Sequence, residues 1–153
     1  MLRRFSSAAW AAVLALVVAE APGSAASGSG AMAIVRQFLD AFNRDDVAAM
    51  AATCAPQTAI LDDFPPHTWQ SCAAWAKTLG TFDKASGNTW GTVTIGAPWH
   101  DDVTGNVAYV VVPASFAYKS RGKPVNETGA VWTLALEKTA AGWRITAWAW
   151  GGH

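Results

Sequence analysis

Apolar residues in the first third of the chain recur with the period of an α-helix. Between residues 31 and 43 they lie at Ala33, Ile34, Phe38, Leu39 and Phe42. This spacing predicts a helix over that range. Asp45 is suited to cap a second helix, which we expect to end near Cys54 because Pro56 follows. Ser71 can cap a third helix, whose large apolar side chains are Trp75, Leu79 and Phe82.

The pattern changes to that of β-strands after Asn88. Strands are predicted over residues 89–99, 107–118, 124–137 and 143–150, which are rich in β-branched and aromatic residues. Breaks are predicted at 101–102 and 104–106, and turns at 120–123 and 139–142. A short strand over 58–62 precedes the third helix and is ended by Pro65 and Pro66. On the last strand, alternation puts Trp143, Ile145, Ala147 and Ala149 on one face, and Trp148 and Trp150 on the other.

This order of elements indicates one α+β domain. We expect three N-terminal helices to pack against one face of a curved antiparallel sheet, which together form a cone with a cavity inside. The length of 153 residues suits one domain, and 52% hydrophobic with only 14% charged residues allows a large core. The chain has nine tryptophans, which can fill that core or line the cavity.

The N-terminus has the pattern of a secretory signal peptide. Arg3 and Arg4 precede an apolar run over residues 8–18, and small residues at 24–26 provide a cleavage site. An uncleaved membrane anchor is the alternative, although the run is short for a span. We therefore predict a signal peptide over 1–26, a flexible Gly/Ser/Ala-rich lead-in over 27–30 and a domain over 31–153, in a periplasmic or secreted protein.

Charge and composition limit the partners of the domain. The formal net charge is zero and no basic stripe is present, which argues against nucleic acid. No second apolar run is long enough to span a membrane, so we expect no membrane association after cleavage. His100 adjoins Asp101 and Asp102, but three adjacent side chains of a turn rarely converge on one ion. We expect neither a metal nor a cofactor.

The two cysteines, Cys54 and Cys72, flank the acidic stretch described below. Their spacing fits neither a redox CxxC motif nor a zinc site. In an oxidising compartment they can form a disulfide, which would stabilise the fold by roughly 3 kcal/mol in the chain-entropy model. Two buried free thiols are the alternative. We predict the disulfide, because it would fix both ends of the intervening segment.

The densest candidate chemistry lies in residues 60–69. This stretch contains Asp62, Asp63, His67 and Trp69. A carboxylate at the end of an apolar strand can act as a general base, and a nearby histidine can act as its acid partner. The alternatives are structural: the aspartates can cap the turn at Phe64, and His67 can be an ordinary surface residue.

Three motifs carry a resemblance to a known superfamily. They are Asn43-Arg44-Asp45-Asp46, Ile60-Leu61-Asp62-Asp63 and Gly142-Trp143-Arg144-Ile145-Thr146. With these motifs, residues 31–150 resemble the nuclear transport factor two-like superfamily, in particular its SnoaL-like branch. The resemblance implies the same α+β cone. It says little about activity, because one fold carries many functions.

A comparison with the ketosteroid isomerases of that superfamily assigns residues to the cavity. Their general-base aspartate falls on Asp62, which implies that Asp62 points inward and Asp63 toward solvent or the turn. Their oxyanion-binding tyrosine falls on Phe38 and their oxyanion-binding aspartic acid falls near Val131, neither of which can donate a hydrogen bond from its side chain. Steroid isomerase chemistry as such is therefore not expected. Burial without a cation nearby should raise the pKa of Asp62.

From these observations we predict a cavity that binds a small apolar or aromatic molecule, in a protein that forms a homodimer. The expected lining residues are Phe38, Asp62, Trp69, Tyr109, Val131, Trp148 and Trp150. An isomerase- or dehydratase-type enzyme is the first alternative, with Asp62 as general base and His67 or a tyrosine as acid. A non-catalytic dimerisation module is the second.

Overall fold

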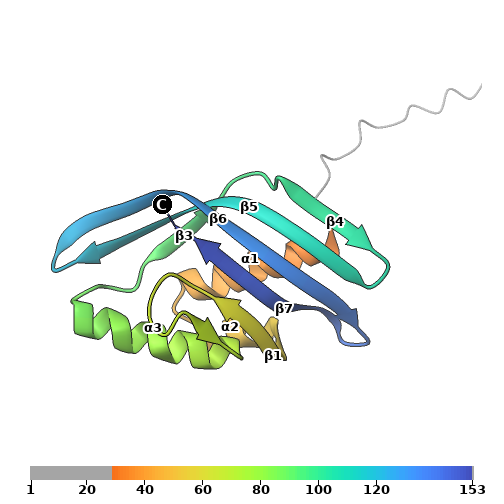
Figure 1. Ribbon diagram of the computed structural model, residues 1–153, viewed down its shortest axis with the longest axis horizontal. Helices are drawn as coiled ribbons and strands as arrows, with labels where there is room; N and C mark the ends of the chain where they lie inside the picture. Colours follow the sequence, from red (N-terminus) through yellow and green to blue (C-terminus); the bar gives the residue numbers. More distant parts are fainter. Residues whose placement is uncertain (1–28, 153) are drawn as a thin grey trace, which may run out of the picture.

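The computed structural model describes residues 29–152, in which three helices gather on one side of a curved seven-stranded sheet (Figure 1). The predicted signal peptide, and the lead-in up to residue 28, lie outside the described residues. The elements are α1 Gly30–Asn43, α2 Val47–Ala52, β1 Cys54–Leu61, β2 Thr68–Trp69, α3 Cys72–Ser86, β3 Thr92–Ile95, β4 His100–Thr104, β5 Val107–Ser120, β6 Lys123–Thr139 and β7 Gly142–Gly151. The predicted α+β architecture is confirmed.

The sheet is mixed, whereas the sequence pattern predicted an antiparallel one. Its strand order is β2-β1-β7-β6-β5-β3, and β4 pairs with the other end of β5. The pairs β5–β6 and β6–β7 are antiparallel, but β1 runs parallel to β7. Ile60 lies opposite Trp148 in this parallel pair. Local periodicity cannot reveal a pairing between strands so far apart in the chain.

Two irregularities in the long strands change which side chains share a face. Gly129 has no partner where β6 passes β5, and its φ of 81° suits glycine. Thr146 is left out of the register between β6 and β7, which continues with Ile145 opposite Leu136 and Ala147 opposite Ala135. The extra residue reverses the alternation, so Ile145 lies on the same face as Trp148. The prediction that these two residues occupy opposite faces was wrong.

The first two helices begin at positions that differ slightly from the prediction. Ser29 caps α1 and Gly30 is its first residue, so the helix extends into the predicted flexible lead-in. Asp46, not Asp45, caps α2, because its carboxylate accepts the Ala49 N–H at 3.0 Å. The cap of α3 at Ser71 is confirmed.

Between α3 and β5, the strand boundaries also differ from the prediction. The predicted strand over 89–99 reduces to β3, and the predicted break at 101–102 is part of β4. Two residues, Gly105 and Asn106, connect β4 to β5, and the hairpin aligns Asp101 with Val110. Asp101 also accepts hydrogen bonds from the N–H and hydroxyl of Ser29, so β4 fixes the start of α1.

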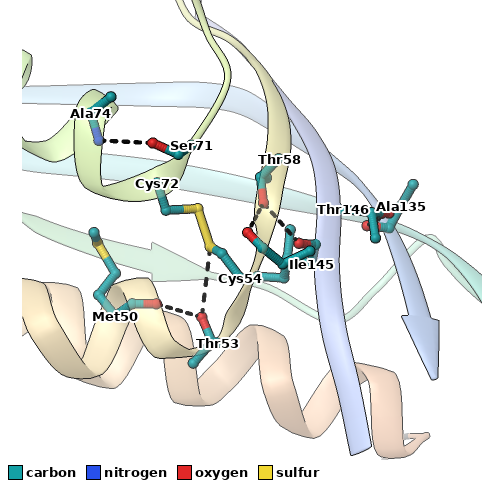
Figure 2. Close-up of a disulfide and its surroundings, with 11 residues drawn as sticks. Met50, Thr53, Cys54, Thr58, Ser71, Cys72, Ala74, Ala135, Ile145 and Thr146 are labelled. Carbon is teal, nitrogen blue, oxygen red and sulfur yellow. Dashed lines mark hydrogen bonds between the residues drawn. A yellow bond between two sulfur atoms is a disulfide. The ribbon is translucent and has the colours of Figure 1, made fainter. Parts of the chain in front are cut away.

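The predicted disulfide between Cys54 and Cys72 is present and joins the start of β1 to the start of α3 (Figure 2). The two Cα atoms lie 6.4 Å apart, within the usual range for disulfides. Next to it, the buried Thr58 hydroxyl donates to the carbonyls of Ala55 and Ile145, at 2.8 and 3.1 Å. The segment between the cysteines contains Asp62 and is therefore held at both ends. Within residues 29–152, no helix is long and apolar enough to cross a membrane.

Candidate functional site

A cavity of about 110 Å³ lies between α1, α3 and the inner face of the sheet. Ten aromatic side chains contribute to its lining: Phe38, Phe42, Phe64, Trp75, Phe82, Phe116, Tyr118, Trp132, Trp148 and Trp150. The remaining lining residues are Leu39, Asp62, Asp63, Leu79, Asp83, Asn88, Val93 and Glu127. The lining thus carries four carboxyl groups and no lysine, arginine or histidine. Such a cavity suits an apolar ring and disfavours an anion.

Asp62 is one of two buried aspartates that line this cavity. It follows the last residue of β1, and only 9% of it is exposed, whereas Asp63 is exposed. One carboxylate oxygen accepts the Trp75 Nε1–H at 2.8 Å and the other accepts the Asp63 N–H at 2.8 Å. Burial nevertheless raises the pKa of Asp62 to about 7. Asp62 can therefore gain or lose a proton near neutral pH.

His67 lies outside the cavity, contrary to its predicted place as acid partner of Asp62. The turn after β1 is closed by the Asp62 N–H, which donates to the His67 carbonyl at 3.0 Å. The His67 Nδ1 atom lies 3.1 Å from the backbone carbonyl oxygen of Asp62. The ring therefore contacts the backbone of the turn and not the carboxyl group, because the turn holds it in an exposed position.

The other residues predicted to line the pocket divide between the two faces of the sheet. Phe38, Trp148 and Trp150 line the cavity, as expected. Val131 does not, because its neighbour Trp132 occupies the inner face and strand alternation turns Val131 outward. Tyr109 is on the outer face as well, where 47% of it remains exposed.

Trp69 lies beside the cavity lining without belonging to it. Its ring packs against Phe64, with 4.8 Å between the ring centroids, and its Nε1–H donates to the Thr78 hydroxyl at 3.1 Å. Trp69 and Tyr109 both border a shallow groove on the outer face of the sheet, together with Leu61, Ala135 and Ala147. The predicted pocket therefore combined residues from two separate surfaces.

Tyr118 and Asp83 are two further polar groups in the cavity lining. Tyr118 donates its hydroxyl hydrogen to Glu127 at 2.9 Å, across the β5–β6 hairpin. The pKa of Tyr118 is raised to about 12, mainly by partial burial and to a smaller extent by the hydrogen bond to Glu127. Asp83 is buried on α3 beside Asn88, and burial raises its pKa as well. The available signal was helical spacing, since Asp83 follows Leu79 by four residues and so lies on the same buried face of α3.

Two of the tryptophans that line the cavity differ from the other tryptophans in their hydrogen bonding. The Nε1 atoms of Trp132 and Trp148 are buried and have no hydrogen-bond partner within residues 29–152. By contrast, the Nε1–H groups of Trp69, Trp75 and Trp90 all donate to protein oxygens.

Comparison with known proteins agrees with this architecture. Residues 31–149 match the family model described as the SnoaL-like domain. The chain belongs to the SnoaL-like family. No curated protein matches the chain.

Solved structures similar to this SnoaL-like chain come from several bacteria. One is a nuclear transport factor 2-like superfamily protein from Salmonella enterica, with a TM-score of 0.66, 18% identity, and coverage of 78% of this chain and 86% of that one. A ketosteroid isomerase-like protein from Erwinia carotovora gives a TM-score of 0.64 and 18% identity, over 80% and 92% of the two chains. A proposed scytalone dehydratase from Novosphingobium aromaticivorans gives 0.65 and 10%, over 80% of each chain. At these identities the likeness establishes the fold alone.

Proposed function

We propose that this SnoaL-like protein binds a small, largely aromatic molecule in the cavity between its helices and its sheet. The observation that carries the proposal is the lining, in which ten aromatic side chains surround a space that also contains Asp62. Apolar cavities with a few polar groups are the usual form of small-molecule sites. The volume of about 110 Å³ is of the order of an engineered cavity of roughly 150 Å³ that binds benzene.

The test is binding of one-ring compounds, measured by quenching of tryptophan fluorescence and confirmed by calorimetry. Toluene and phenol are suitable first probes. Leu79→Phe should abolish binding, because Leu79 lines the cavity and is 7% exposed. Leu61→Phe makes the same change at a residue that is 53% exposed on the outer face, and should leave binding unchanged. Equal binding by both variants would show that the probes occupy another site.

An enzyme that moves a proton is the second candidate, and one observation favours it. Burial raises the pKa of Asp62 to about 7, where a carboxyl group is suited to general acid–base catalysis. Isomerisation and dehydration are the reaction classes named for some of the similar structures. If an isomerase or dehydratase activity is found, Asp62→Asn should abolish turnover and retain ligand binding, whereas Asp63→Asn should retain most of the activity. Full activity of Asp62→Asn would exclude this mechanism.

We further propose that the protein is exported, with residues 1–26 as a cleaved signal peptide. The disulfide between Cys54 and Cys72 supports this proposal, because disulfides persist in oxidising compartments. The exported protein should begin near Ser27 when its N-terminus is sequenced. An intact Met1 on protein recovered from the cytoplasm would contradict export.

We also propose that the outer face of the sheet forms a homodimer. Leu61 and Tyr109 are 53% and 47% exposed there, beside a groove bordered by Ala135, Ala147 and Ala149. Contiguous exposed apolar surface is typical of interaction sites. Sedimentation equilibrium should give twice the monomer mass, and Ala147→Glu should give a monomer. A wild-type monomer at high concentration would refute the proposal. A dimer that binds no small molecule would favour a dimerisation module.

A further inference from the structure

The carboxyl groups of the cavity have no positively charged partner in the protein. Four of them line the cavity, and no basic side chain does. Within residues 29–152, the only basic and acidic side chains within 4.0 Å of each other are His100 and Asp102, which lie outside this lining. Burial raises the pKa of both Asp62 and Asp83, and the effects that oppose it come from hydrogen bonds, not from a positive charge. A cation bound in the cavity would supply that charge.

Three of the four carboxyl groups lie near the hydroxyl group of Tyr118. Glu127 accepts the hydrogen of that hydroxyl at 2.9 Å. Asn88 holds Asp83 on the same side of the cavity, because its side chain donates to Asp83 at 3.4 Å and its backbone pairs with the end of β5. Besides burial and the bond to Glu127, the charges of Asp83 and Asp63 raise the pKa of Tyr118, as expected of carboxylates near its hydroxyl.

Asp83 and Glu127 each have a carboxyl oxygen that remains available to a ligand. In the part of the chain that the structure describes, Oδ2 of Asp83 and Oε2 of Glu127 accept no hydrogen bond. Neither oxygen is closed off from solvent, since the buried side-chain atoms without a partner are both indole nitrogens. Asp83 is only 8% exposed, so its carboxylate lies in a largely desolvated site, where an ion pair is stronger than at the surface.

Aromatic rings adjoin these carboxyl groups. The rings of Phe116 and Tyr118 are stacked with 5.0 Å between their centroids, and the Phe42 ring lies 6.2 Å from that of Phe116. All three rings line the cavity. The faces of aromatic rings attract organic cations, whereas ions such as Mg²⁺ and Ca²⁺ need a shell of oxygen ligands. Unpaired carboxylates beside aromatic rings therefore favour an organic cation.

We propose that the ligand is a small protonated amine, whose aromatic ring occupies the aromatic part of the cavity and whose ammonium group contacts Asp83 and Glu127. This inference rests on the proposed function, since it requires a molecule in the cavity. It narrows the ligand class from aromatic compounds in general to those that carry an ammonium group. The basic residues next to Asp83 and Tyr118 in the sequence, Lys84 and Lys119, are exposed and do not line the cavity.

The experiment compares benzylamine with benzyl alcohol, which has nearly the same shape and no charge. The buffer is mildly alkaline, so that the carboxyl groups are ionised and the amine keeps its proton. Calorimetry should show benzylamine binding about tenfold more tightly, the difference expected between a charge-assisted and a neutral hydrogen bond. This preference should fall as salt is added, because ions screen charged pairs. Benzoate should bind more weakly than either, because it is an anion.

Variants assign the effect to the two carboxyl groups. Asp83→Asn and Glu127→Gln each keep the size of the side chain and remove its charge, so each should reduce the preference for benzylamine over benzyl alcohol severalfold. The ratio of the two affinities cancels changes in cavity shape that both ligands experience. Glu137→Gln is the matched control, because it removes the same charge from an exposed residue of β6 that does not line the cavity; it should keep the wild-type ratio.

The outcomes separate this inference from the proposed function. Equal affinity of the wild type for benzylamine and benzyl alcohol, or tighter binding of the alcohol, would overturn the ammonium ligand while leaving the binding cavity in place. A ratio unchanged in both cavity variants would overturn the assigned carboxyl groups. Tight binding of benzoate would overturn the choice of a cation. Binding of none of the one-ring probes would overturn the proposed function, and this inference with it.

Discussion

The substitution Asp62→Asn should change the pH dependence of stability in a direction that the structure fixes. Burial raises the pKa of Asp62 from 3.8 to about 7 in the folded protein. In the unfolded chain the carboxyl group is solvated and ionises near its ordinary value. Between these two values the folded state binds a proton that the unfolded state does not. The contribution of Asp62 to the free energy of unfolding is therefore complete in acid and is lost as the pH rises through 7.

The magnitude follows from the size of the shift. Because one pKa unit corresponds to about 1.4 kcal/mol, ionising Asp62 should lower the free energy of unfolding by about 4 kcal/mol above neutral pH. Asparagine cannot ionise, but its single oxygen can accept only one of the two hydrogen bonds, from Trp75 and Asp63, that the carboxylate accepts. Losing one bond should cost about 1 kcal/mol. The variant should thus be slightly less stable than the wild type in acid and more stable, by about 3 kcal/mol, in alkali.

The assay is urea denaturation followed by tryptophan fluorescence, in buffers from about pH 4 to about pH 8, with the disulfide kept oxidised. Asp63→Asn is the matched control, since it removes an exposed carboxylate one residue away and leaves Asp62 in place. It should keep most of the wild-type pH dependence. A difference in stability between the wild type and Asp62→Asn that stays constant over this range would contradict the prediction, because it would mean that Asp62 ionises equally easily in the folded and unfolded states.

Three further predictions concern stability and can be checked by the same denaturation measurements. Cys54→Ala should lower the free energy of unfolding by about 3 kcal/mol, because the disulfide closes a loop of 18 residues; an unchanged midpoint would show that the bridge contributes nothing. Gly91→Ala should severely destabilise the folded protein, because its new Cβ would lie 2.3 Å from the Phe116 ring. Gly80→Ala, on α3, is the matched control: its Cβ meets no atom within 4 Å, so the variant should raise the free energy of unfolding by about 0.5–1 kcal/mol. Asn43→Ala removes both side-chain bonds, of 2.9 and 2.8 Å, that tie α1 to β3, and should cost about 1–3 kcal/mol; a loss no larger than that of an exposed alanine substitution would contradict that role.

The local elements, and the features that depend on neighbouring residues, were predictable from residue type and spacing. Helical spacing predicted α1 and α3, and Ser71 was identified as a cap from its residue type. The turn before β6 was predicted from Arg121 and Gly122. The pairing of Cys54 with Cys72 was predicted from their position around one segment. Each of these inferences needs only the chemistry of a few residues and the period of a regular element.

The position of Asp62 was also predictable in part. Strand alternation predicted that only one of two adjacent aspartates points inward, and the resemblance to the ketosteroid isomerases selected the one that the structure buries. Asp63 is exposed, but it also borders the cavity, because both aspartates follow the end of β1. The partner of Asp62 was not predictable in the same way. Sequence proximity suggested His67, but the closing of the turn directs that ring to the backbone, and Trp75 from α3 donates to the carboxylate instead.

Which residues share the cavity depends on contacts between segments that are distant in the sequence. The parallel pairing of β1 with β7 joins segments from opposite ends of the domain, and the unpaired Thr146 moves Ile145 to the face of Trp148. Neither feature has a local period, because pairing and bulges are fixed by how the whole sheet closes over the helices. Trp132 lines the cavity where Val131 was expected, and the expected lining residues Trp69 and Tyr109 are absent from it.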